Sequence, residues 1–102
     1  MGLLASFVNK LIPQRDPFTL YVSIDELPNS RDWGTVDFAV GKRLLFSDNV
    51  YLLAPTTDQI EALIGQHWQE IQSSGYQRIV YDNVADWVRE RIEEKLRSGR
   101  RN

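Results

Sequence analysis

His67 is the only histidine in the chain, and histidine is the side chain best suited to act as a general base near neutral pH. Such a base needs a carboxylate partner, and Asp25, Glu26 and Asp82 follow apolar runs at the ends of expected strands. None of these residues has the spacing D-x-D, H-x-x-x-D/E or E-x-x-H that accompanies metal or hydrolytic sites. We therefore expect no catalytic residue and no metal ligand. A small hydrolase-like enzyme centred on His67 is kept as the second alternative.

Residues that could hold a cofactor are equally sparse. The chain has no cysteine, which removes thiolate nucleophiles, zinc fingers and iron–sulfur ligation. The run Gly41-Lys42-Arg43 lacks the preceding glycine and the following Ser or Thr that a phosphate-binding P-loop requires. A hairpin turn explains this run better. The sequence therefore predicts no cofactor and no enzymatic activity.

Basic residues gather towards the C-terminus, where they are candidates for contact with nucleic acid. Acidic residues lie among them, and the spacings Arg89–Glu93 and Glu93–Arg97 allow ion pairing along a helix. The net charge of −2 also argues against a surface built to neutralise phosphates. A nucleic-acid-binding regulatory protein is therefore the first alternative. Its candidate contacts are Arg89, Arg91, Lys95, Arg97, Arg100 and Arg101.

Aromatic residues point to a protein partner instead. Three tryptophans and four tyrosines in 102 residues exceed what a small core readily buries, and aromatics left at a surface usually make contacts. We expect a non-catalytic protein–protein interaction or adaptor protein that forms a homodimer. The candidate partner-binding residues are Phe7, Leu11, Trp33, Tyr21 and Tyr51.

Residues 1–12 are predicted to form an amphipathic helix that ends before Pro13. Its apolar residues recur at helical spacing, and the opposite face carries one cation, Lys10, where a helix on a membrane surface normally shows several. The apolar stripe needs a cover. The chain's own sheet and a second copy of the chain are the expected covers, and a membrane surface is the third. The stripe consists of Leu3, Leu4, Phe7, Val8, Leu11 and Ile12.

Alternating apolar residues predict the strands that would position these candidates. Residues 18–24 alternate between an apolar and a wetter face, whereas the turn-forming residues in 26–34 indicate a loop. Three further runs, at residues 36–40, 43–46 and 50–54, predict a meander with turns at residues 41–42 and 47–49. A last short strand is expected at residues 76–81, running parallel to the strand that ends at residue 54.

Two helices are expected after the meander. The first has Thr57 as its N-cap and ends at Ser73-Ser74-Gly75. The second is capped by Asn83 and stops at Gly99. The apolar stripes predicted for burial are Ile60, Leu63, Ile64, Trp68 and Ile71 in the first helix, and Val84, Trp87, Val88, Ile92 and Leu96 in the second.

Together these elements predict one α+β domain over residues 1–102. It has a mostly antiparallel sheet of four to five strands, an N-terminal helix, two C-terminal helices and a frayed basic tail at residues 97–102. No apolar run approaches the roughly 18 to 20 residues of a membrane-spanning helix, and no signal peptide is recognisable. We therefore expect a cytoplasmic location.

Overall fold

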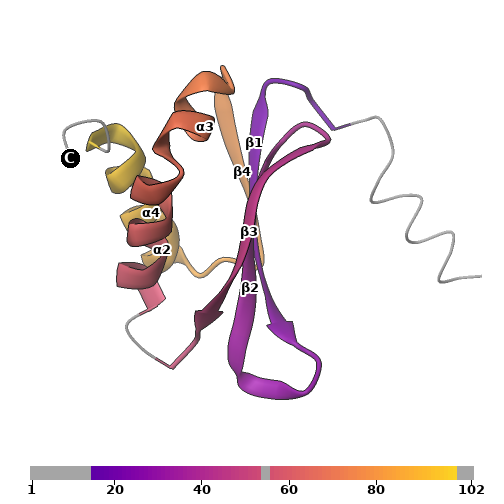
Figure 1. Cartoon of the computed structure of the whole chain (residues 1–102), viewed down its shortest axis with the longest axis vertical. Helices are drawn as coiled ribbons and strands as arrows, with labels where there is room; N and C mark the ends of the chain where they lie inside the picture. The colour runs from indigo at the N-terminus through magenta and orange to yellow at the C-terminus, as the bar shows by residue number, and fades with distance from the viewer. Residues whose placement is uncertain (1–14, 54–55, 99–102) are drawn as a thin grey trace, which may run out of the picture.

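Three strands, two consecutive helices, a fourth strand and a last helix follow one another along the chain (Figure 1). The structure is a computed structural model and describes residues 15–53 and 56–98. The elements are β1 (Thr19–Leu27), β2 (Ser30–Val40), β3 (Arg43–Tyr51), α2 (Thr56–Gln66), α3 (Trp68–Ser73), β4 (Arg78–Asp82) and α4 (Asp86–Ser98). The predicted α+β class is confirmed, with four strands in the part of the chain described.

The four strands form one sheet in the order β3-β2-β1-β4. β1, β2 and β3 pair antiparallel as a meander, because two-residue turns at residues 28–29 and 41–42 join them. Gly41 in the second turn has a φ of 61°, a conformation that glycine adopts without steric penalty. β4 comes after α2 and α3 and pairs parallel with β1, so that Leu20 lies opposite Ile79. The sheet is therefore mostly antiparallel, as predicted.

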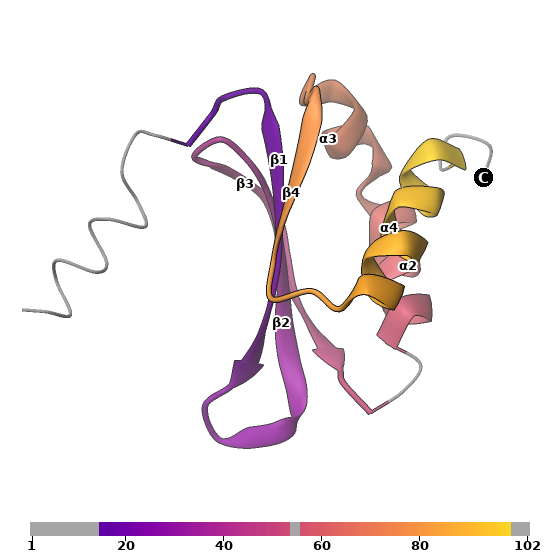
Figure 2. The same cartoon turned by 180° about the vertical axis from the view of Figure 1, so that it is seen from behind.

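All three helices lie on one side of the sheet, as both Figure 1 and Figure 2 show. This arrangement follows from the strand alternation, because every second residue of β1 and β2 is apolar and buried on that side. The helices contribute apolar residues that meet this face of the sheet. The resulting core contains Leu20, Val22, Ile24, Val36, Phe38, Val40, Phe46, Val50, Ile60, Ile64, Ile71, Val88, Ile92 and Leu96.

Two predicted loops are strand in the structure, so these predictions were wrong. Residues 30–34 belong to β2, because β1 extends beyond Ile24 and pairs with them. Residues 47–49 belong to β3, where they lie opposite residues 35–37 of β2. The polar residues in both segments suggested turns. Polar side chains that remain in contact with water do not end a strand, and this holds in the edge strand β3 as well as at the exposed residues 31–33 of the inner strand β2.

The helices also differ from the prediction in three places. The first helix is interrupted at His67 and forms α2 and α3, and α2 already begins at Thr56, so that Thr57 lies inside it. Asn83 does not cap α4: its φ is 61°, and its side-chain amide donates a hydrogen bond to the Ile24 carbonyl oxygen at 2.7 Å. Trp87 was expected in the core, but 60% of its surface is exposed.

Phe18 was likewise expected on the apolar face, but it lies just before β1 and is 52% exposed. The predicted helix at residues 1–12 and its candidates Phe7 and Leu11 lie outside the described residues, as do Gly99 and the end of the basic tail. Among the helices of the described ranges, none has the length and apolar character needed to cross a bilayer.

Candidate interaction face of the sheet

The side of the sheet opposite the helices is covered by no helix from residues 15–53 and 56–98 (Figure 2). We call this surface the helix-free face. Its side chains belong to the residues that alternate with the buried ones, and the strand registers place them side by side. They are Thr19, Tyr21, Ser23 and Asp25 of β1, Trp33, Thr35, Asp37 and Ala39 of β2, Ser47, Asn49 and Tyr51 of β3, and Arg78, Val80 and Asp82 of β4.

An apolar row crosses the strands at one level of this face. Tyr21 of β1 lies opposite Val80 of β4 on one side and Ala39 of β2 on the other. Val80 is 46% exposed, whereas Ala39 is buried beneath its neighbours. In this row Val80 is the exposed apolar side chain that a partner could bury.

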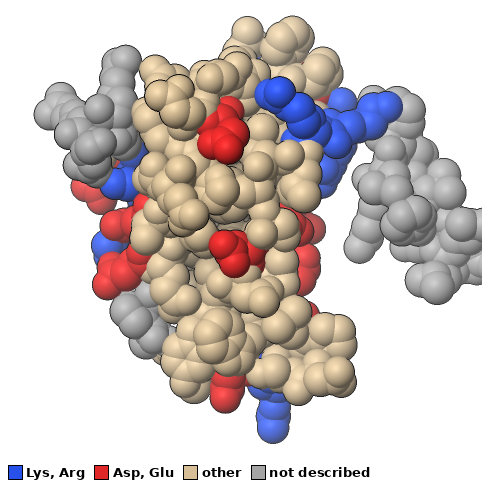
Figure 3. Space-filling view, viewed as in Figure 1, with Lys and Arg blue, Asp and Glu red and all other residues tan. Residues whose placement is uncertain are grey.

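An acidic row follows directly below the apolar one. Ser23 lies between Asp82 of β4 and Asp37 of β2, and Asp25 is two residues further along β1. None of these three carboxylates forms an ion pair with another described residue. Figure 3, which views the sheet from its edge, shows mostly uncharged surface in the middle of the molecule with separate groups of acidic atoms on it. The helix-free face is therefore suited to a partner that carries cations.

Trp33 and Tyr51 form an aromatic pair at the far end of the same face. Their ring centroids are 5.2 Å apart at an angle of 56°, and Trp33 remains 43% exposed. Trp33 and Tyr51 lie opposite each other on β2 and β3. The Tyr51 backbone is also fixed by Gln59 of α2, whose side-chain Oε1 accepts a hydrogen bond from the Tyr51 N–H at 2.8 Å. Such a fixed aromatic surface is available for contact at little cost in side-chain entropy.

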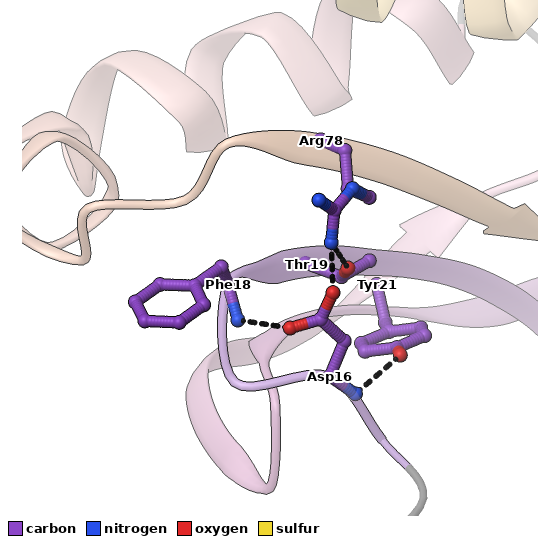
Figure 4. Close-up of polar contacts among 5 residues, drawn as sticks. All are labelled: Asp16, Phe18, Thr19, Tyr21 and Arg78. Carbon is purple, nitrogen blue, oxygen red and sulfur yellow. Dashed lines mark hydrogen bonds and ion pairs between the residues drawn. The ribbon is translucent and has the colours of Figure 1, made fainter.

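The opposite corner of the face is closed by the residues that precede β1 (Figure 4). The Asp16 backbone N–H donates to the Tyr21 hydroxyl at 2.9 Å, and its carboxylate accepts from the Phe18 N–H at 2.8 Å and pairs with Arg78. Arg15 lies 4.4 Å above the Tyr21 ring centroid. These contacts engage Arg15 and Arg78 at this corner, where Thr19 is buried. Neither arginine pairs with the carboxylates further along the sheet.

His67 lies in the helical layer and not on this face. Its ring stacks on Phe46 of β3 with centroids 4.3 Å apart, and its Nδ1 is 3.8 Å from a Glu70 carboxylate oxygen. Asp25 and Asp82 lie on the other side of the sheet, so the structure does not bring them to His67. In the described ranges, no group of three or more potential ligands is placed to hold a metal ion.

Two of the four basic residues of α4, Arg89 and Arg91, form ion pairs within the chain. Arg91 pairs across to α2, with its Nη2 2.7 Å from Glu61 and 3.6 Å from Asp58. Arg89 pairs with Asp86 at 3.2 Å, and not with Glu93 as its spacing suggested. The Arg91 pairs join α4 to α2, whereas the Arg89 pair lies within α4. Of the remaining candidates, Lys95 and Arg97 are described, whereas Arg100 and Arg101 lie outside the described residues.

Hollows in the surface are shallow and lie beside the helices. Two of about 310 Å³ are found, one between α2 and α4 and one between the edge of β3 and α3, where Leu44 and Leu45 line it. A third, of about 210 Å³, lies beside β4 and is lined by Tyr76, Ile79, Glu93, Leu96 and Arg97.

Burial raises the pKa of Tyr76, and burial together with the Glu93 carboxylate raises the pKa of Tyr81. Both phenols are therefore neutral at physiological pH, and the buried Tyr81 hydroxyl has no hydrogen-bond partner among the described residues.

Three of the five partner-binding candidates lie on the helix-free face: Trp33 and Tyr51 form a pair, and Tyr21 lies at the opposite end of the face. Sequence reasoning missed the exposed Val80 and the acidic row. A signal for the polar part of this face is present in the sequence, because the alternation over residues 18–24 places Tyr21 and Ser23 on the wetter side of the strand. Comparison with protein-family models, with curated proteins and with solved structures finds no match to this chain.

Replacing His67 tests its placement as a packing residue. We expect His67→Gln to lower the free energy of unfolding by about 1 kcal/mol, the typical worth of an aromatic pair, because the stack on Phe46 is lost. The measurement is urea denaturation followed by fluorescence. Glu70→Gln removes only the distant carboxylate and should leave the midpoint unchanged. A larger loss for Glu70→Gln than for His67→Gln would contradict this placement.

Proposed function

We propose that this protein is a non-catalytic interaction module that acts as a homodimer and binds a partner protein on the helix-free face. One observation carries the proposal: exposed Trp33 and Val80 share a face with three carboxylates that have no described ion-pair partner. Apolar contacts would supply affinity, and charge would supply orientation. The partner is accordingly a protein segment with apolar side chains next to Lys or Arg.

Charge favours this partner over nucleic acid. Phosphates would be repelled by Asp25, Asp37 and Asp82, and three of the described arginines are already engaged in ion pairs within the chain. A polypeptide with cations gains from the same carboxylates. Exposed charges of this kind mainly accelerate association and exclude wrong partners, so binding should weaken at high salt.

Two exposed tryptophans on opposite layers of the molecule allow a matched test. Trp33 lies on the helix-free face, whereas Trp87 lies on α4 and is more exposed still. Full-length wild type, Trp33→Ala, Trp87→Ala and Asp37→Lys are used to capture proteins from a lysate of the native organism. We expect one protein that is retained by wild type and Trp87→Ala and reduced about tenfold or more by the other two variants. Its binding segment, mapped by cross-linking, should carry apolar residues next to Lys or Arg.

Several results would contradict the proposal. The first is a captured protein that is lost with Trp87→Ala but kept with Trp33→Ala. The second is that all variants capture the same proteins in the same amounts. Salt-sensitive binding of mixed-sequence DNA would favour the nucleic-acid alternative. Binding of anionic vesicles by wild type that is lost in Phe7→Glu with Leu11→Glu would place the contact surface in residues 1–12 instead. Better capture by a chain that starts at residue 15 would show that the N-terminal segment itself occupies the face.

A further inference from the structure

The two edges of the sheet differ in how well they are protected from pairing with another strand. β3 carries an irregularity between Phe38 and Ala39 of its partner strand, which leaves Leu45 without an opposite residue. It also places Asp48 opposite Val36, on the side that faces the helices. A bulge and an inward-pointing charge are the devices by which natural edge strands avoid pairing. β3 is therefore a protected edge.

β4 has neither device. Its five-residue register with β1 runs without interruption, and its helix-facing residues are the uncharged Ile79 and Tyr81. Figure 2 shows β4 in front of the other strands, with no described element lying over its outer edge. An edge strand without a bulge, a proline or an inward charge is a ready template for another strand.

The register shows which backbone groups of β4 face outward. The Thr19 carbonyl oxygen accepts from the N–H of Gly41, in the turn that follows β2, so by alternation Leu20 and Val22 direct their backbone groups towards β4. In a parallel ladder, the N–H and C=O of a residue bond to the two residues that flank its register partner. The register partner is Ile79 for Leu20 and Tyr81 for Val22. Residues 78, 80 and 82 are thereby turned to β1. The N–H and C=O groups of Ile79 and Tyr81 point away from the sheet.

The sequence of β4, Arg78-Ile79-Val80-Tyr81-Asp82, is complementary to itself when reversed. Centred on Val80, an antiparallel copy places Arg78 opposite Asp82 twice and Val80 opposite Val80, all on the helix-free side. Ile79 then meets Tyr81 on the helix side, and these are the residues with outward-facing backbone groups. One register thus satisfies backbone, charge and apolar pairing together.

We propose that two copies of this chain pair through β4 in this antiparallel register and form one continuous sheet. The inference goes beyond the proposed function, because it names the surface through which the homodimer forms. A two-fold axis at Val80 relates the copies and makes the interface isologous. Arg78 already contacts Asp16 through Nη1, and its remaining guanidinium nitrogens are available to Asp82 of the second copy.

The absence of cysteine from the chain makes the register directly testable. Val80→Cys in the full-length protein places two thiols opposite each other across the axis, where Cα atoms of a non-hydrogen-bonded antiparallel pair lie about 4.5 Å apart, within disulfide range. Asp82→Cys lies on the same edge, but its two copies are separated by four residues along the strand, about 13 Å. We expect Val80→Cys to oxidise to a covalent dimer at least tenfold faster than Asp82→Cys. Leu44→Cys on β3 is the control for random collision.

Charge reversal gives an independent readout of the same register. Wild type should be a dimer in a concentration series followed by light scattering, and Asp82→Arg should weaken it about tenfold or more, because two cations then face each other at each end. Glu90→Arg on α4 adds the same charge elsewhere and should leave the dimer intact. A monomeric wild type, or equal cross-linking of Val80→Cys and Asp82→Cys, overturns the inference. Either result would leave Trp33-dependent capture of a partner unaffected. The proposed dimer and the proposed partner site can therefore be disproved independently.

Discussion

Val22→Asp is expected to unfold most of the protein at temperatures where the wild type is fully folded. Val22 lies in the middle of β1, between β2 and β4, and none of its surface is exposed. A carboxylate there has no cation within the core and either remains charged without solvent or takes up a proton, and both cost free energy. We expect a loss of about 4 kcal/mol or more, from a total of roughly 5 to 15 kcal/mol.

Thermal and urea denaturation followed by circular dichroism measure this loss. Val80→Asp is the matched control, because it makes the same change on the neighbouring strand at a residue that remains partly exposed. At low protein concentration, where any dimer has dissociated, the control should cost less than about 1 kcal/mol. Equal losses for the two variants would mean that β1 does not separate a buried from an exposed side.

Phe38→Ala is expected to have the second largest effect. Phe38 is fully buried in β2 and stacks on Phe46 with ring centroids 4.6 Å apart, and Phe46 stacks in turn on His67. Removing the ring loses its buried apolar area and leaves a cavity between sheet and helices. Such a substitution typically costs about 3 to 5 kcal/mol, which for a domain of this size lowers the melting temperature by about 12 °C or more.

The same substitution at Phe18 provides the comparison. Phe18 lies before β1 with half of its surface in solvent, so Phe18→Ala should cost less than about 1 kcal/mol. Both variants are measured by urea denaturation and fitted with the same m value, the slope of the unfolding free energy against urea concentration. If Phe38→Ala lowered the free energy of unfolding as little as Phe18→Ala, the aromatic stack from the sheet to the helix break would contribute little to stability. The packing role assigned to His67 would then be wrong as well.

Periodicity was sufficient to predict the features that depend on burial along one element. Leu20, Val22 and Ile24 of β1 and Ile60, Ile64 and Ile71 of the helices lie in the core as their spacing indicated. Turn residues with a specific conformational role were also readable, as at Gly41 and Gly75, both of which have positive φ. These signals are local, so a single segment of sequence contains them.

Features that depend on pairing between distant segments were not predictable in this way. Ser47, Asp48 and Asn49 resemble a turn, and only β2 opposite them makes them strand. Gly34 is close to the backbone of β1, since a Cβ there would lie 2.8 Å from the Asp25 carbonyl oxygen, and nothing local to residue 34 reveals this. The acidic row of the candidate site likewise arises from three strands, and the register that aligns them is a tertiary property.

The pairing of β4 with β1 has a consequence for how the chain is made. Thr19 and Arg78, which face each other in the register, are 59 residues apart along the chain. During synthesis the meander is complete before β4 has left the ribosome, so β1 is at first an unpaired edge in the nascent chain. Closing so long a loop is slow compared with forming a hairpin. We therefore expect translation arrested before residue 78 to yield aggregation-prone nascent chains, and folding to be completed only after the last third of the protein has emerged.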